Sequence, residues 1–328
     1  MPYARTIVES YTTDVTLRQL FYRLVSLPHG HPAKIPNTDN AYSLLSRTSA
    51  EWRRVGTFPD LADQGAQVFP ASGSVSPGQA IESLRRWYRR DRTEGQEYQV
   101  WLGVEKVGMV NQLRSWFRSD RGLPILALGG QATQGLIDEL RRDVEADGRP
   151  AILLYAGDHD PSGWRILQSF VDRTGWWANP ELPDWNPADM PENRGWVLDH
   201  HGKPKAPVPN YDRYRKYRVA LQPEQCVEYG LPRNSAKEKD SNLPAFLANY
   251  AHTLDDVEAE NGCGVQIEMD ALEPNDLRQL FTDAVEQFWD DEAYDAVIED
   301  EDDDREHIDL LTQIAERYTA DELRGLLA

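Results

Sequence analysis

Carboxylate side chains follow two of the apolar segments in this sequence, at positions where they could do chemistry. The segment AILLYAG at 151–157 leads directly to Asp158 and Asp160, and YQVWLGV at 98–104 leads to Glu105. Neighbouring strands of a sheet lie roughly 5 Å apart, so carboxylates at the ends of adjacent strands can meet one cation. Carboxylate oxygens suit Mg²⁺, which keeps open positions for water or phosphate oxygens. The three carboxylates therefore predict a magnesium site for phosphoryl-transfer chemistry.

Each of these features also has a simpler explanation. A DxD sequence after a strand is often a solvated turn, and a glutamate after a strand often complements the dipole of the next helix. The combination of Glu105, a glycine pair at 129–130 and the DxDxxG sequence at 158–163 favours a metal site over a turn.

The surrounding pattern predicts an α/β fold. Apolar strand-like runs alternate three times with helical patterns, which is typical of a parallel sheet covered on both faces. Functional groups in such sheets collect beyond the carboxyl ends of the strands. The predicted strands span 98–104, 123–129 and 151–157, and the predicted helices span 106–120, 131–148 and 161–175.

Two further helices predict a separate N-terminal module. Apolar residues recur at helical spacing over 15–27, and a second helix over 38–56 begins at a Thr or Asp cap and ends at Gly56. Turns and short strands follow, with a Ser/Gly/Pro-rich linker near 71–78. This order of elements suggests a winged-helix (CAP-like) DNA-binding domain over 1–78.

Arginines on these helices are candidates for DNA contact. The second helix carries Arg47, Arg53 and Arg54, which could bind phosphates and fix the register of a duplex. An ordinary exposed charged face explains them equally well. The arginine-rich helix at 79–92 is predicted to bridge two domains, within a linker over 79–97.

Three short motifs resemble the Toprim domain of topoisomerases, primases and related nucleases. They are VEK at 104–106, the glycine pair at 129–130 and GDHDPSG at 157–163. Within that group the chain most resembles the topoisomerase VI A subunit and the meiotic double-strand-break transesterase. The resemblance implies that the three carboxylates named above bind Mg²⁺, and that a winged-helix domain precedes the Toprim domain.

The same families carry an Arg-x-x-[Phe/Tyr]-Tyr motif, and this chain has RQLFY at 18–22. The resemblance implies that Tyr22 attacks a DNA phosphate. Arg18 and Tyr22 are four residues apart and share a helix face. Because tyrosine has an unperturbed pKa of about 10, Tyr22 needs help from a cation or a base. Arg18 could stabilise the charge that develops on the phosphate. The alternative is a structural Tyr22 at the edge of a helix core, beside a solvated Arg18.

The acidic charge of the chain is concentrated at its C-terminal end. The net charge is −20, yet residues 251–328 hold 25 acidic and 4 basic residues, whereas residues 1–250 hold 30 and 31. The body of the protein is therefore neutral, and DNA binding is not excluded. Cys226 and Cys263 are too few for a disulfide framework and lack metal-ligand spacing.

No apolar run approaches the roughly 18 residues of a membrane span, and the first residues lack a signal-peptide pattern. We therefore expect an intracellular protein, either cytoplasmic and nucleoid-associated or phage-encoded. No phosphate-binding loop or GxGxxG motif is visible, so ATP-driven strand passage would require a separate ATPase subunit.

The Toprim domain is predicted to span 98–290, with an irregular Trp/Pro-rich insertion at 176–218. Near its end, a strand-like alternation at 265–272 carries Glu268 and Asp270. These two residues could join the acidic site, but the pattern favours a solvent-facing side of the strand.

The C-terminal segment at 291–328 is predicted as an acidic linker followed by a helix. Its like-charge block IEDEDDD at 298–304 favours a solvated linker.

Three functions remain open from the sequence. The first is a type IIB topoisomerase-like transesterase, in which Tyr22 cleaves double-stranded DNA with Mg²⁺ and forms a phosphotyrosyl link. The resembled families imply a homodimer and a double-strand break for this activity. The second is a hydrolytic Toprim nuclease with a water nucleophile, as in the Wadjet plasmid-defence system. The third is a non-catalytic DNA-binding assembly protein, which three carboxylates at strand ends argue against.

Overall fold

The chain forms two units in the computed structural model. Unit 1 contains residues 1–64 and 97–288, and unit 2 contains residues 65–96 and 289–328. Unit 1 thus joins the predicted N-terminal module to the predicted α/β domain, and unit 2 joins the predicted linker helix to the acidic C-terminal segment. The structure describes residues 2–11, 15–62, 76–174, 196–198, 204–207, 214–235, 240–250 and 265–327.

Unit 1 is built on a four-stranded sheet in which every pairing is parallel. The strand order is β2-β1-β3-β6, and the strands are β1 (Gln99–Val104), β2 (Ile125–Ala127), β3 (Ala151–Ala156) and β6 (Tyr214–Ala220). The predicted α/β fold with a parallel sheet is confirmed. All six residues of β3 are buried, because this strand is central and covered on both faces.

The fourth strand lies in the segment predicted as an irregular insertion. β6 has the sequence YRKYRVA, in which charged residues interrupt the apolar run that marks the other strands. Lys216 and Arg218 are nevertheless buried. The prediction of an irregular segment up to residue 218 is therefore wrong at its end, while most of 176–213 lies outside the described residues.

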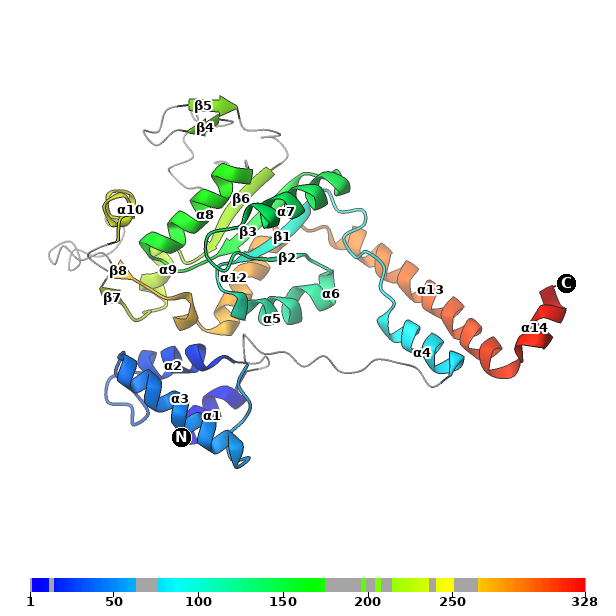
Figure 1. The fold of residues 1–328 in the computed structure, drawn as a ribbon, viewed down its shortest axis with the longest axis horizontal. Coiled ribbons are helices and arrows are strands. Elements are labelled where there is room, and N and C mark those ends of the chain that lie inside the picture. Colours follow the sequence, from blue (N-terminus) through cyan, green and yellow to red (C-terminus); the bar gives the residue numbers. More distant parts are fainter. Residues whose placement is uncertain are drawn as a thin grey trace. The chain divides into compact units, whose positions relative to one another are not determined.

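Helices cover both faces of the sheet (Figure 1). One face packs against α7 (Gln134–Asp147) and α8 (Pro161–Thr174) through a core that includes Leu153, Tyr155 and Phe170. The other face is covered by α5 (Val110–Leu113) and α12 (Pro274–Glu286).

The helix predicted over 106–120 is divided. It contains a 3₁₀ turn (Val107–Met109), α5, a π-helical turn (Arg114–Arg118) and α6 (Ser119–Arg121). The other described elements between residues 97 and 288 are two strand pairs, two helices and a 3₁₀ turn. They are β4 (Trp196–Leu198) with β5 (Pro204–Pro207), β7 (Asn234–Ser235) with β8 (Val265–Gln266), α9 (Pro223–Glu228), α10 (Leu243–Tyr250) and the turn at Met269–Ala271.

Three helices form the described part of the N-terminal segment: α1 (Pro2–Glu9), α2 (Leu17–Ser26) and α3 (Asp39–Arg54). Thr16 caps α2 in a capping box with Gln19, and Thr38 caps α3. The two predicted helices are thus confirmed, with the Thr cap. The predicted short strands and linker fall largely on 63–75, outside the described residues, so the winged helix stays a prediction.

Unit 2 contains α4 (Pro77–Trp87), α13 (Asp291–Arg317) and α14 (Ala320–Leu327). The acidic block at 298–304, predicted as a solvated linker, lies inside α13. Its Glu301 is fully buried and bonds to Arg92 and Arg305, so neutralisation by arginines allows the helix to continue through the block. Within the described parts of the chain, no helix has both the length and the apolar character needed to cross a bilayer.

Candidate functional site

Glu105 and Asp158 meet at the carboxyl ends of β1 and β3, as the sequence predicts. The two strands are paired neighbours, and the backbone N–H of Glu105 donates to the carbonyl of Ala156 at 3.0 Å. The backbone N–H of Asp158 then donates to Oε2 of Glu105, also at 3.0 Å. The first carboxylate is therefore fixed against the turn that carries the second.

Two glycines leave the space that the Glu105 carboxylate occupies. A Cβ atom on Gly157 would lie 3.0 Å from Oε2 of Glu105 and 2.9 Å from the Tyr155 ring. A Cβ atom on Gly163 would lie 2.9 Å from the same Oε2 and would overlap the carbonyl oxygen of Asp158. The glycines of the GDHDPSG turn are thus required by the carboxylate from the neighbouring strand.

Replacing Gly163 with alanine should destabilise unit 1 by about 1–3 kcal/mol, because the methyl group must displace the Asp158 backbone or the Glu105 carboxylate. Chemical denaturation measures this loss. Gly135→Ala is the matched control, since Gly135 also lies in a helix and its nearest neighbour would be 4.0 Å away. If the two variants were equally stable, the close contacts expected for a methyl group at position 163 would be contradicted.

Asp160 has a structural role in addition to any chemical one. Its Oδ1 accepts the backbone N–H of Gly163 at 2.6 Å, in the first turn of α8, and its Oδ2 accepts Nε2 of Gln266 at 3.0 Å. Asp160 therefore fixes the start of α8 beside the other two carboxylates.

The Lys106 ammonium lies among three carboxylates, and sequence reasoning assigned it no role. Its Nζ is 2.8 Å from Oδ1 of Asp158, 2.7 Å from Oε2 of Glu268 and 2.7 Å from Oδ2 of Asp270. The VEK motif placed Lys106 at the strand end. Nothing in that motif indicated that the lysine would turn toward Asp158.

Glu268 and Asp270 belong to the site, so the prediction that they face solvent is wrong. Their exposed fractions are 8% and 2%. The expected strand stops at β8 and gives way to the 3₁₀ turn at Met269–Ala271. The backbone N–H of Met269 donates to Oδ1 of Asp158 at 2.7 Å, which holds this turn against the end of β3.

Arg18 and Tyr22 reach the same cluster from α2. Nη2 of Arg18 is 2.7 Å from Oε2 of Glu268, and its Nε is 3.1 Å from Oδ2 of Asp270. The Arg18 guanidinium carbon is 5.6 Å from the centre of the Tyr22 ring, in agreement with their shared helix face. Arg18 is thus paired rather than simply solvated, and Tyr22 is buried, with an exposed fraction of 7%.

Further polar contacts dock α2 in this position. Nε2 of Gln19 donates to Oε1 of Gln112 at 2.9 Å in a buried contact, and Arg23 forms an ion pair with Glu273. Unit 1 therefore presents the RQLFY motif and the strand-end carboxylates at one location.

The pKa values of the clustered carboxyl groups show that ionising all of them at once is unfavourable. Burial raises the pKa of Asp158 to about 8; the charge of Lys106 acts against this rise, and the carboxylates of Glu105 and Glu268 add to it. Burial also raises the pKa values of Glu105 and Asp160. Although burial alone would raise the pKa of Glu268, the charges of Lys106 and Arg18 lower it. Burial therefore outweighs the nearby cations at the three predicted magnesium ligands, but not at Glu268.

The pKa values of Lys106 and Tyr22 are raised as well, for different reasons. Burial alone would lower the pKa of Lys106, but Asp158, Asp270 and Glu268 together raise it, so this ammonium keeps its charge. Burial raises the pKa of Tyr22, and Glu268 raises it further, against the weaker effects of Arg18 and Lys106. Tyr22 is therefore a neutral phenol in this arrangement.

The three predicted ligands fit Mg²⁺ in their chemistry. They are oxygen donors, half-buried in Glu105 and buried in Asp158 and Asp160. Asp160 raises the pKa of Glu105, Glu105 raises that of Asp158, and Glu268 raises that of Asp160, so a divalent cation would relieve repulsion at this site. Among the described residues, no three His, Cys, Asp or Glu side chains are already arranged as a metal cage. Glu105 and Asp158 each accept a protein hydrogen bond through one carboxylate oxygen, whereas Asp160 does so through both. Glu105 and Asp158 are accordingly the better-placed ligands.

Stabilisation by Mg²⁺ should increase with pH. Because Asp158 has a raised pKa in the folded state, its proton contributes stability that is full below the unfolded pKa and is lost as the pH rises through about 8. Mg²⁺ competes with that proton, so we expect the melting temperature to rise by about 2–5 °C with Mg²⁺ near pH 9 and by less near pH 6. Thermal denaturation in both buffers, with Asp158→Asn as control, measures this. A shift that is independent of pH would contradict it.

The predicted DNA-binding arginines lie on α3. Arg47 and Arg54 are exposed, and Arg53 is half-buried. Arg47 and Arg54 are seven residues apart and share one face of the helix, whereas Arg53 does not. Their role in DNA binding stays a prediction.

Comparison with known proteins adds no assignment: no protein-family model matches this chain, and no curated protein matches it.

Proposed function

We propose that this protein cleaves double-stranded DNA with Mg²⁺, using Tyr22 as the nucleophile in a transesterification of the topoisomerase VI A type. The observation that carries the proposal is the pairing of Arg18 with Glu268 and Asp270. It places the helix of the RQLFY motif against the acidic end of a parallel sheet, the combination that the resembled Toprim families use. A homodimer, with one break in each strand, and a separate ATPase subunit belong to this proposal as partners.

In this reaction the Tyr22 oxygen attacks a backbone phosphorus, and the bond from phosphorus to one deoxyribose oxygen breaks. The phosphate remains on Tyr22 as a phosphodiester, the phenolic proton is lost and the departing sugar oxygen takes up a proton, so no oxidant or nucleotide is needed. Mg²⁺, held by Glu105 and Asp158 with support from Asp160, would supply charge stabilisation of the phosphate oxygens.

The chain's own cations have defined tasks in this scheme. A DNA phosphate entering the site would offer Arg18 an anionic partner in place of Glu268 and Asp270. Lys106, which contacts Glu268 as well, lies behind this carboxylate as a second cation. Arg18 would then stabilise the charge that grows on the phosphate. Its release from Glu268 would also free α2, so the Tyr22 phenol could leave its buried position.

Incubation with supercoiled plasmid and Mg²⁺ tests the proposal, followed by denaturation with and without protease. The wild type should give DNA ends that enter the gel only after protease treatment, and Tyr22→Phe should remove them, since phenylalanine has no nucleophile. Tyr42→Phe, in the neighbouring helix α3, is the matched control and should retain linked ends. Protein-linked ends that persist in Tyr22→Phe would contradict the role of Tyr22.

Hydrolysis is the second candidate, and the state of Tyr22 favours it. The phenol is buried and its pKa is raised, so in this arrangement a metal-activated water has easier access to a phosphate than Tyr22 does. Hydrolysis predicts free ends without protease treatment, retained in Tyr22→Phe and lost in Asp158→Asn. Absence of cleavage by the wild type would instead favour the non-catalytic DNA-binding protein.

A further inference from the structure

In unit 2, α4 and the segment that follows it run antiparallel to α13 and are joined to it by ion pairs. Arg85 pairs with Asp309, Arg90 pairs with Asp304 at 2.6 Å, and Arg92 pairs with Glu301 at 3.0 Å, so later residues of the first segment meet earlier residues of α13. This α4–α13 hairpin is held together mainly by charge. Among its described residues, Val297 and Ile308 are the apolar side chains with less than a tenth of their surface exposed.

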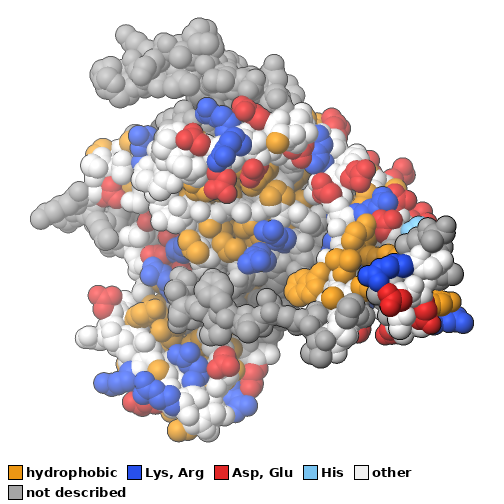
Figure 2. Space-filling view, turned by 45° about the vertical axis from the view of Figure 1, so that its right-hand side comes forward, with side chains coloured by type: hydrophobic (Ala, Val, Ile, Leu, Met, Phe, Trp, Pro, Cys, Tyr) orange, Lys and Arg blue, Asp and Glu red, His pale blue; other side chains and the backbone are white. Residues whose placement is uncertain are grey.

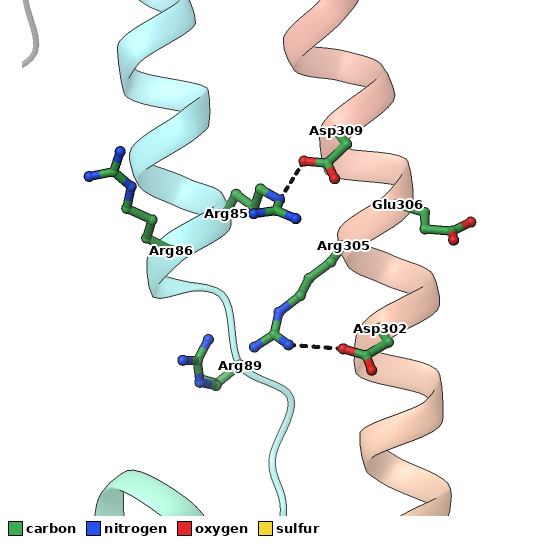
Figure 3. A pocket seen from close by; sticks show the side chains of 7 residues that line it. All are labelled: Arg85, Arg86, Arg89, Asp302, Arg305, Glu306 and Asp309. Carbon is green, nitrogen blue, oxygen red and sulfur yellow. Dashed lines mark hydrogen bonds and ion pairs between the residues drawn. The ribbon is translucent and has the colours of Figure 1, made fainter.

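One side of the hairpin is charged, and several of its charges form ion pairs within the hairpin. Figure 3 shows this charged flank, where Arg85 points to Asp309 and Arg305 points to Asp302. The residues that line it are Arg85, Arg86, Arg89, Asp302, Arg305, Glu306 and Asp309.

The other side exposes large apolar side chains. The exposed fractions are 83% for Trp87, 56% for Leu84, 56% for Leu311 and 41% for Ile314, with Leu310 beside them at 55%. At 100° per residue, Leu84 and Trp87 lie on the same flank of α4, and Leu311 and Ile314 lie on the flank of α13 that adjoins it in an antiparallel pair. Figure 2 shows apolar side chains gathered over these helices. We name this surface the apolar flank.

We propose that the apolar flank binds the same flank of a second copy of this chain, so that two hairpins form an antiparallel four-helix bundle. The five exposed side chains offer roughly 600 Å² per copy, so pairing would bury about 1,200 Å² in total, within the range of a specific interface. Two amphipathic helices cannot enclose an apolar core, whereas four can.

The flank is self-complementary in shape. The ion pair of Arg85 with Asp309 puts Leu84 level with Leu310, so Trp87 lies toward one end of the flank and Ile314 toward the other. A twofold axis through the middle, perpendicular to the helices, therefore sets the large indole of each copy at the level of the smaller Ile314 of the other.

Sedimentation analysis of the full chain without DNA tests this interface, whatever chemistry the acidic cluster performs. The wild type should be dimeric, and Trp87→Asp with Leu311→Asp should raise the dimer dissociation constant by at least about 100-fold, because each substitution acts twice in a symmetric interface. Val227→Asp, an exposed apolar residue of α9 in unit 1, should leave the dimer intact. A monomeric wild type, or a dimer that survives the double substitution, would overturn the proposal.

A second measurement separates lost pairing from lost folding. Leu84→Cys, near the proposed twofold axis, should give a covalent dimer on mild oxidation, whereas Arg86→Cys on the charged flank should not. Equal cross-linking of both variants, or none in Leu84→Cys, would place the contact elsewhere and overturn the assignment.

Discussion

Lys106→Met should destabilise unit 1 by about 3–5 kcal/mol at neutral pH, because buried carboxylates lose the cation that they share. Asp158, Glu268 and Asp270 all lie within 2.8 Å of its Nζ. Methionine preserves most of the aliphatic volume and removes the charge. Chemical denaturation of the wild type and the variant measures the loss.

The pH dependence of that loss identifies its cause. Protonation can neutralise the carboxylates that no longer have Lys106 as a partner. The loss of stability in Lys106→Met should therefore be larger near pH 8 than near pH 5. Arg149→Met is the control: the pair of Arg149 with Asp147 is local and near the surface, and its removal should cost at most about 1 kcal/mol. If Lys106→Met cost no more than this control, Lys106 would not hold the cluster together.

Asp158→Asn should reduce Mg²⁺-dependent DNA cleavage by about 1,000-fold or more. The substitution keeps the shape of the side chain and an oxygen for the Met269 N–H, but it removes the charge that the metal needs. Loss of several kcal/mol of transition-state stabilisation corresponds to this reduction, since each 1.36 kcal/mol is about tenfold in rate. Rates of plasmid cleavage at saturating Mg²⁺ provide the measurement.

Glu273→Gln is the matched control for this variant. Glu273 is also a carboxylate that contacts α2, through Arg23, and it accepts a hydrogen bond from Tyr11, but it lies outside the cluster around Lys106. We expect its cleavage rate to stay within about threefold of wild type, as for a partly exposed ion pair. Wild-type cleavage by Asp158→Asn would exclude the strand-end carboxylates as the catalytic site.

The parts of the site that follow strand ends could be predicted from the sequence. Glu105 and Asp158 come directly after apolar runs, and the parallel pairing of β1 with β3 brings those ends together. The caps of α2 and α3 are local signals of the same kind, since Thr16 and Thr38 bond to N–H groups three residues later.

The parts of the site that depend on contacts between distant segments could not be predicted from the sequence. Glu268 and Asp270 are more than a hundred residues from Asp158 in sequence, and they are held at the site by the bond from the Met269 N–H to that aspartate and by ion pairs with Lys106 and Arg18. Lys106 has three partners from two distant segments, and no local pattern encodes their meeting. β6 was missed because Lys216 and Arg218 are buried against the usual preference of charged residues for the surface.

The acidic block of α13 also depends on contacts with a distant segment of the chain. The sequence of this block predicts a linker because like charges repel. Apart from Arg305, the arginines that pair with it lie some two hundred residues earlier. A charge pattern read along the chain has no information about a partner helix.

Mass spectrometry of the denatured cleavage product tests the central claim most directly. After nuclease and protease digestion of a reaction with Mg²⁺, the peptide that contains Tyr22 should carry a nucleotide through a phosphotyrosyl bond, and this peptide should be absent in the Asp158→Asn reaction. An unmodified Tyr22 peptide in a reaction that has cleaved the DNA, or an adduct on another residue, would contradict cleavage by Tyr22.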